Sequence, residues 1–158
     1  MGIPRFTDII RLYVISPEVF VIVLLGAVVF FYPGPIEYFG SEASRDGSVL
    51  QYIALIPIAL LSVTFGLSKE ILKPLDEANN RMLYEWPDYW RLKYRVLAAI
   101  IFCLAASAGA LGLWVYKTRL QHLLIGAGLI AAVLIALVST ISLYLGYLRL
   151  REILQGGS

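Results

Sequence analysis

The feature that most constrains this chain is a set of four runs that contain no Lys, Arg, Asp or Glu. They cover residues 19–36, 47–68, 96–116 and 120–148. A helix needs about 20 apolar residues to cross a hydrocarbon layer of roughly 30 Å. Only helices or closed barrels satisfy their backbone hydrogen bonds in lipid, and these runs lack the alternation of barrel strands. The sequence therefore predicts an all-α, integral membrane four-helix bundle.

The composition supports a single membrane domain. The chain is 59% hydrophobic and only 15% charged, which lies outside the range of ordinary soluble domains. We expect one domain over residues 1–155, and residues 156–158 resemble a cloning remnant outside it. The single cysteine, Cys103, excludes an intramolecular disulfide. The predicted spans are about 17–32, 48–68, 95–116 and 121–148.

The distribution of positive charge predicts the orientation. If both termini lie inside, ten of the thirteen Lys and Arg residues fall on the inner side. The positive-inside rule then places the termini and residues 69–95 in the cytoplasm. A net charge of +2 is too small and too dispersed to suggest a nucleic-acid partner.

The amino end predicts a short amphipathic helix in the cytoplasmic interface. Residues 3–15 carry apolar side chains at helical spacing, although they equally suit an extension of the first span. Ser16, Pro17 and Glu18 favour a break, because they suit the N-cap and first turn of a new helix. We interpret Glu18 as a charge of this cap region at the membrane edge. The alternative is an intramembrane proton carrier.

The two connections on either side of the second span differ in character. Residues 33–48 are predicted to be an outer connection, with Gly40 and Asp46-Gly47 as turn formers. Residues 69–95 are predicted to be a cytoplasmic helical hairpin that breaks at Pro87. Charges of alternating sign follow one another at i,i+4 spacing in its first half, which suits either a partner surface or a solvated ion-pair face. The candidate partner-binding residues are Lys73, Glu77, Arg81, Tyr84, Glu85 and Trp86.

Small and hydroxyl-bearing residues inside the spans have two interpretations. They can line a pore, which would require an oligomer because four helices fill their own interior. Alternatively, they let helices approach closely and form hydrogen bonds between them. The residues in question are Ser62, Thr64, Gly128, Ala132, Ala136, Ser139, Thr140 and Ser142, and the third span adds small-residue pairs at Ala105 with Gly109 and Ala108 with Gly112.

Catalytic chemistry has little support in this sequence. The one histidine, His122, lies at the outer end of the fourth span and suits an interfacial anchor. We find no metal-ligand spacing, no phosphate loop and no set of nucleophile and base. We expect no catalytic residues, no metal and no cofactor, so an integral membrane enzyme is the weakest of three hypotheses.

Short motifs in the first half of the chain resemble a group of phage-defence proteins. They are Tyr32-Pro33-Gly34, the residues Ala43 to Gly47, and Thr64-Phe65 before an exit into basic residues. Together with the topology, they resemble small four-span phage-exclusion and anti-phage membrane proteins of the RexB-like or KwaA-like kind. The resemblance implies a bacterial inner-membrane protein that acts in antiviral defence. It carries over no catalytic residues.

These observations lead to two main functional hypotheses. In the first, a homo-oligomer in contact with membrane lipids acts as a sensor or scaffold and recruits a cytoplasmic protein through residues 69–95. In the second, the oligomer is an ion channel or a membrane-depolarising effector. Both place a multi-pass protein in the bacterial inner (plasma) membrane, with both termini in the cytoplasm.

Overall fold

The structure is a computed structural model, and it describes residues 16–72 and 89–155. Its helices are α2 (Pro17–Phe31), α3 (Pro33–Arg45), α4 (Gly47–Leu72), α6 (Tyr89–Val115), the 3-10 turn η1 (Lys117–Arg119) and α7 (His122–Gln155). Three of them, α4, α6 and α7, are long and apolar enough to cross a membrane. The pair α2 and α3 meets the same test only together, across a bend of 100°. The predicted class, a helical membrane protein, is confirmed at this level.

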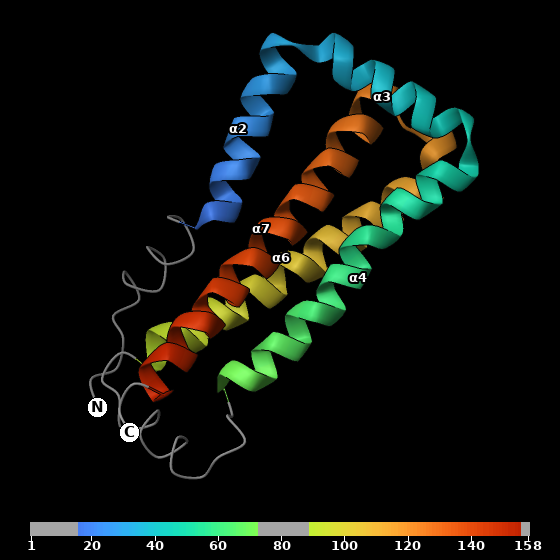
Figure 1. Ribbon diagram of the computed structural model, residues 1–158. Coiled ribbons are helices and arrows are strands. Elements are labelled where there is room, and N and C mark those ends of the chain that lie inside the picture. The colour runs from blue at the N-terminus through green and yellow to red at the C-terminus, as the bar shows by residue number, and fades with distance from the viewer. Residues whose placement is uncertain (1–15, 73–88, 156–158) are drawn as a thin grey trace.

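The long helices α4, α6 and α7 lie side by side, and α7 is the central element (Figure 1). It packs against each of the other α-helices. Helix α2 lies along the part of α7 that follows His122, and α3 crosses that same end of the bundle (Figure 1). The last described residue of α4 and the first of α6 lie at the opposite end, near the end of α7.

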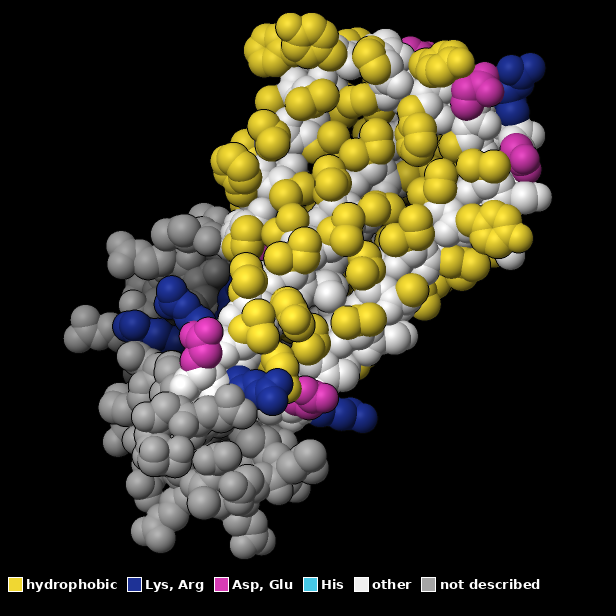
Figure 2. Space-filling view, viewed as in Figure 1, with side chains coloured by type: hydrophobic (Ala, Val, Ile, Leu, Met, Phe, Trp, Pro, Cys, Tyr) yellow, Lys and Arg dark blue, Asp and Glu magenta, His cyan; other side chains and the backbone are white. Residues whose placement is uncertain are grey.

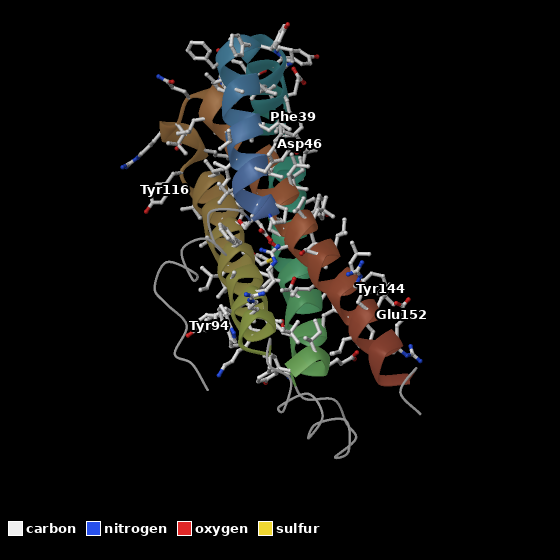
Figure 3. All side chains as sticks on the ribbon, turned by 90° about the vertical axis from the view of Figure 1, so that its left-hand side faces the viewer. Phe39, Asp46, Tyr94, Tyr116, Tyr144 and Glu152 are labelled. Atoms are coloured by element: carbon white, nitrogen blue, oxygen red, sulfur yellow. The ribbon has the colours of Figure 1, made fainter. Side chains whose placement is uncertain are left out.

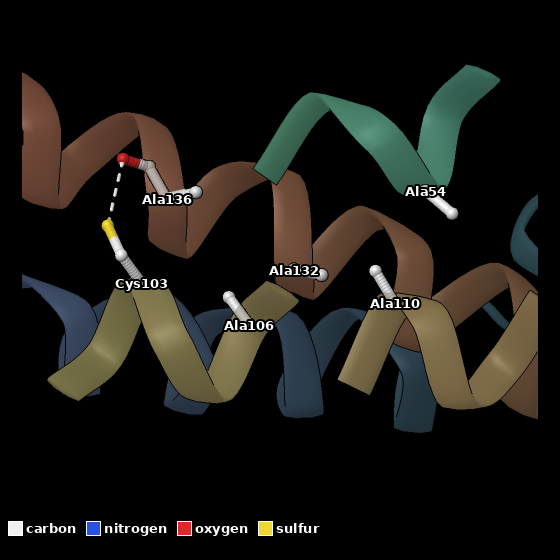
Figure 4. Packing of buried hydrophobic residues seen from close by; sticks show 6 residues of the cluster. All are labelled: Ala54, Cys103, Ala106, Ala110, Ala132 and Ala136. Carbon is white, nitrogen blue, oxygen red and sulfur yellow. Dashed lines mark hydrogen bonds between the residues drawn. The ribbon is translucent and has the colours of Figure 1, made fainter. Parts of the chain in front are cut away.

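Large apolar side chains lie on the outside of the bundle as well as in its interior. Large apolar side chains cover the outside over α2, α4 and α7 (Figure 2), and Phe20, Phe30 and Tyr52 are each about seven-tenths exposed or more. One buried cluster between α4, α6 and α7 holds small residues, which are Ala54, Cys103, Ala106, Ala110, Ala132 and Ala136 (Figure 4). A second cluster between the same helices holds Ile71, Val96, Ala99, Leu143 and Leu150. A continuous apolar exterior would aggregate in water, whereas lipid solvates it. Small interior residues are how membrane helices pack closely.

Residues 33–45, which belong to the predicted outer connection, form a helix, so the prediction of Gly40 as a turn former is wrong. Pro33 begins α3, as suits the first turn of a helix, and Ile36, Gly40 and Ala43 form its buried face. A Cβ atom on Gly40 would collide with the backbone carbonyl of His122, and one on Gly126 would collide with that of Ile36. Gly40 is therefore a contact point between α3 and α7 rather than a turn former.

Other predicted boundaries agree with the structure. Helix α4 continues beyond Ser68 to Leu72, into the segment 69–95 that was predicted to be helical, and a short connection that contains η1 joins α6 to α7. Asp46 and Tyr116 lie toward one end of the bundle, and Tyr94 and Glu152 toward the other (Figure 3). The amphipathic segment 3–15 and the hairpin residues 73–88 lie outside the described residues.

Candidate functional site

The site begins at the first turn of α2. Ser16 is the N-cap, and its Oγ accepts a hydrogen bond of 3.3 Å from the backbone N–H of Val19. Pro17 and Glu18 follow in the first turn, as the sequence predicted. A carboxylate in this position is stabilised by the positive end of the helix dipole. The local capping prediction is thus confirmed.

The surroundings of Glu18 differ from the prediction. Its side chain is 0% exposed, and its Oε1 accepts a hydrogen bond of 2.9 Å from Ser139 Oγ, near the middle of α7. Ser139 is about ten residues, or roughly 15 Å of helix, before Arg149. Helix α2 is shorter than α7 and begins halfway along it, so its cap region lies inside the bundle. Glu18 is therefore a charge of the cap region, as predicted, and its side chain is buried within the bundle.

Arg95, in the second turn of α6, provides the opposite charge. Its Nη1 donates to Glu18 Oε2 at 3.1 Å, and its Nη2 donates to Glu18 Oε1 at 2.9 Å. This is the two-point geometry in which a planar guanidinium matches a carboxylate. The Arg95 side chain is 21% exposed, so the cation lies at the rim of the bundle and reaches inward. The sequence analysis counted Arg95 only as an inner-side charge.

Ser142 completes the network around the ion pair. Its Oγ accepts a further hydrogen bond of 3.0 Å from Arg95 Nη2. One turn of α7 therefore contributes two hydroxyl groups, with Ser139 on the carboxylate and Ser142 on the guanidinium. We call Glu18, Arg95, Ser139 and Ser142 the ion-pair network. It joins α2, α6 and α7 at one level of the bundle.

A second polar contact lies beside this network and joins the three long helices. Thr64 Oγ1 of α4 is 3.0 Å from Thr140 Oγ1 of α7 and 3.5 Å from Cys103 Sγ of α6. Thr140 donates its hydroxyl hydrogen to the carbonyl of Ala136 at 2.8 Å, so Thr64 is the donor in the Thr64–Thr140 contact. The Cys103 thiol also points to the Ala136 carbonyl, at 3.8 Å (Figure 4). Ser139 and Thr140 are adjacent, so the two polar groups share one layer.

Because the ion pair is buried, its hydrogen bonds strongly restrict how α2, α6 and α7 can be arranged. Moving one charge into a low-dielectric interior costs several kcal/mol, and the partner charge offsets this only with good hydrogen-bond geometry. Here the carboxylate accepts hydrogen bonds from Arg95 and Ser139. A buried ionisable group in a membrane bundle is rare enough to mark a candidate functional site.

The candidate pore residues divide between the interior and the exterior of the bundle. Gly128 packs against Leu113 of α6, and Ala132 and Ala136 lie in the small-residue core. Thr64, Ser139 and Thr140 are buried and hydrogen-bonded between helices, which supports their interpretation as packing residues. Ser62 is exposed and donates to the carbonyl of Ile58 on its own helix.

The six candidate partner-binding residues, from Lys73 to Trp86, lie outside the described residues. The structure describes instead the two ends that flank them, Leu72 and Tyr89. Arg95 is only two turns beyond Tyr89 on α6. The ion-pair network therefore includes Arg95, the last residue of the predicted hairpin 69–95.

Within the described part of the chain, no group of three or more His, Cys, Asp or Glu side chains is close enough to hold a metal ion. The ion-pair network holds a carboxylate and a guanidinium that share hydrogen bonds with Ser139 and Ser142. Comparison of the chain with protein-family models, curated proteins and solved structures found no match.

Proposed function

We propose that this protein is a sensor or scaffold of the bacterial inner membrane that recruits a cytoplasmic partner through residues 69–95. In this proposal the bent pair α2 and α3 is the fourth membrane-embedded segment, both termini are cytoplasmic, and the protein forms homo-oligomers. The apolar exterior and the grouping of Lys69, Arg91, Lys93, Arg149 and Arg151 at one end of the bundle support this arrangement.

One observation supports signalling more than any other. The buried carboxylate of Glu18 is bound by Arg95, which is the last residue of the predicted hairpin 69–95 and lies in the second turn of α6. A change in the position of α2 would therefore alter the contacts of Arg95, and a change at the hairpin would alter the contacts of Glu18. Such reciprocity is what a membrane sensor requires of two coupled sites.

The antiviral role rests on the resemblance of residues 32–47 and 64–65 to phage-exclusion proteins. Cells that produce the protein should give fewer phage plaques than cells with an empty vector. Replacing Lys73, Glu77, Arg81 and Glu85 together by Ala should abolish protection, because these side chains would hold the partner. The matched control replaces the inner-side charges of α7, Arg149, Arg151 and Glu152, by Ala.

Equal amounts of each variant in the membrane must be verified by immunoblotting. Protection that survives the hairpin changes, or that is lost equally in the α7 control, would contradict the hairpin as the partner site. Plaque numbers that are the same with and without the wild-type protein, across a panel of phages, would contradict the antiviral role.

A channel or depolarising effector is the second candidate, and the structure provides one argument for it. Ion-coupled membrane proteins carry ionisable groups inside the bundle, and Glu18 is such a group. The reconstituted protein should then conduct ions across a planar bilayer. Replacing Ser142 by Ala should alter the conductance, because its hydroxyl contacts the guanidinium of Arg95, whereas the outward-facing change Ser62→Ala should not. Bilayers that stay silent at all voltages would exclude this candidate.

A further inference from the structure

Helix α2 has an unusual attachment to the rest of the molecule. Of its 15 residues, the only one with a buried side chain is Glu18. Val21, Leu25 and Val29 recur at i+4 spacing as a half-buried stripe, consistent with packing on α7. Most of the other apolar side chains of α2 are exposed, including Phe20, Val23, Leu24, Phe30 and Phe31.

In lipid, the hydrophobic effect does not hold such a helix on the bundle. In water, the apolar surface of α2 would hold it on the bundle, but lipid tails solvate that surface as well as protein does. Association then depends on close packing and on interhelical polar contacts. Among the described residues, the side chains of α2 that pack on α7 are only half-buried, so the ion-pair network is the main polar attachment of α2 to α6 and α7.

The other end of α2 has the geometry of a hinge. Helices α2 and α3 meet at Tyr32 across a bend of 100°. Helix α3 is itself fixed to α7, because Gly40 and Gly126 bring the two backbones into contact. Movement of α2 about Tyr32 would therefore leave α3 and the three long helices in place.

We propose that the ion pair of Glu18 and Arg95 is a releasable latch that holds α2 on the bundle. In the latched state the carboxylate accepts from Arg95 and Ser139, as the structure has it. In the released state α2 turns about Tyr32 into the surrounding lipid, and its amino end carries Glu18 away from Arg95. Coupling of release to the hairpin at residues 69–95 rests on the proposed function, whereas the latch itself does not.

Spin-label distance measurements on the full chain in lipid nanodiscs test the latch. The background is Cys103→Ala, and labels are attached to cysteines introduced at exposed positions. One pair, Val23→Cys and Leu104→Cys, reports the distance between α2 and α6. The control pair, Val63→Cys and Leu104→Cys, reports the distance between α4 and α6 within the bundle.

The variant Arg95→Gln removes the cation and leaves the carboxylate buried. We expect a second distance between α2 and α6, which comes from released molecules. The ratio of latched to released molecules should be lower than in the wild-type protein by about tenfold or more. The variant Glu18→Gln should release α2 less, because a neutral amide can still accept from Arg95 and Ser139. The matched control Glu42→Gln breaks the exposed pair with Arg45 and should leave both distances unchanged.

An α2–α6 distance in Arg95→Gln that equals the wild-type distance would overturn the latch. Equal broadening of the α4–α6 control distance would overturn it too, because the ion pair would then hold the whole bundle rather than α2. Either result is independent of the plaque experiment, which tests the partner and the antiviral role.

Discussion

Helix α2 and the three long helices are held by different forces. Between α4, α6 and α7 one buried cluster is made of alanines and a cysteine, which let the backbones approach one another, and a second is made mostly of larger apolar side chains. Helix α2 has no buried apolar side chain and is fastened by a charged pair at its first turn. Close packing between the long helices allows one good arrangement, whereas an ion pair can open and close. If the latch exists, the long helices should keep their arrangement when α2 moves.

The largest expected effect comes from removing one charge of the pair. Arg95→Gln should lower the free energy of unfolding by about 3–5 kcal/mol if α2 stays in place, because a buried carboxylate loses its counter-charge. Release of α2 would reduce this loss. Adding Glu18→Gln should recover part of the stability, since no uncompensated charge then remains. Detergent titration with sodium dodecyl sulfate in mixed micelles measures these values.

The decisive measurement is which of the two variants, Arg95→Gln or the double variant, is more stable. The double variant should be more stable than Arg95→Gln alone, although it lacks one more wild-type side chain. A double variant that is less stable than the single one would mean that Glu18 contributes through contacts other than Arg95. The difference between α2 and the long helices would then no longer rest on charge.

The second prediction tests close packing by making the same substitution, Gly→Ala, at two glycines. Gly126→Ala should destabilise the protein by about 1–3 kcal/mol or more, because the new methyl group meets the backbone of α3 at Ile36. Gly109→Ala is the matched control on α6, where no atom lies within 4 Å of the added Cβ. It should be neutral or stabilise the helix by up to about 1 kcal/mol. Thermal unfolding in detergent compares the two, and equal melting temperatures would contradict the tight α3–α7 crossing.

The sequence predicted the long helices and their packing better than it predicted α2 and α3. Apolar runs marked the long helices, and small residues at i+4 spacing included Gly128, Ala132 and Ala136, which lie at contacts between these helices. The same spacing also selected Ala105 with Gly109, and these two face outward. The spacing of small residues defines one face of a helix, but it does not show whether that face contacts another helix or lies on the outside of the bundle. Residues 33–45 appeared polar and rich in turn formers, so their helix was missed.

The ion-pair network could be predicted only in part. Glu18 and Arg95 each adjoin an apolar run, have opposite charges and were assigned to the same side of the membrane, so a pair could have been suggested. Their contact joins residues 77 positions apart in the chain. It depends on α2 starting beside Ser139, halfway along α7. Sequence periodicity carries no information about such an offset between helices.

A smaller effect distinguishes hydroxyl groups inside the bundle from those outside it. Thr64→Val keeps the shape of the side chain and removes its hydrogen bonds with Thr140 and Cys103. Because interhelical hydrogen bonds in membranes contribute about 0.6 kcal/mol on average, we expect a loss of that size. Ser62→Val on the lipid-facing side of α4 should change the stability less, since that hydroxyl bonds only within its own helix. A larger loss for Ser62→Val in detergent titration would contradict this distinction.

The smallest effect concerns Asp46, at the corner between α3 and α4 and far from the latch. The backbone N–H of Ser48 donates to Asp46 Oδ1 at 2.9 Å and holds the pKa of this carboxyl below its ordinary value, and Lys117 lowers the pKa further. A lowered pKa in the folded state stabilises the protein above the unfolded-state pKa of about 3.9. This stabilisation falls as the pH drops from there through the folded-state pKa. We therefore expect a slight decrease in melting temperature below about pH 4, which Asp46→Asn should diminish while keeping an oxygen for Ser48. A decrease of the same size in the variant would assign the pH dependence to other carboxyl groups.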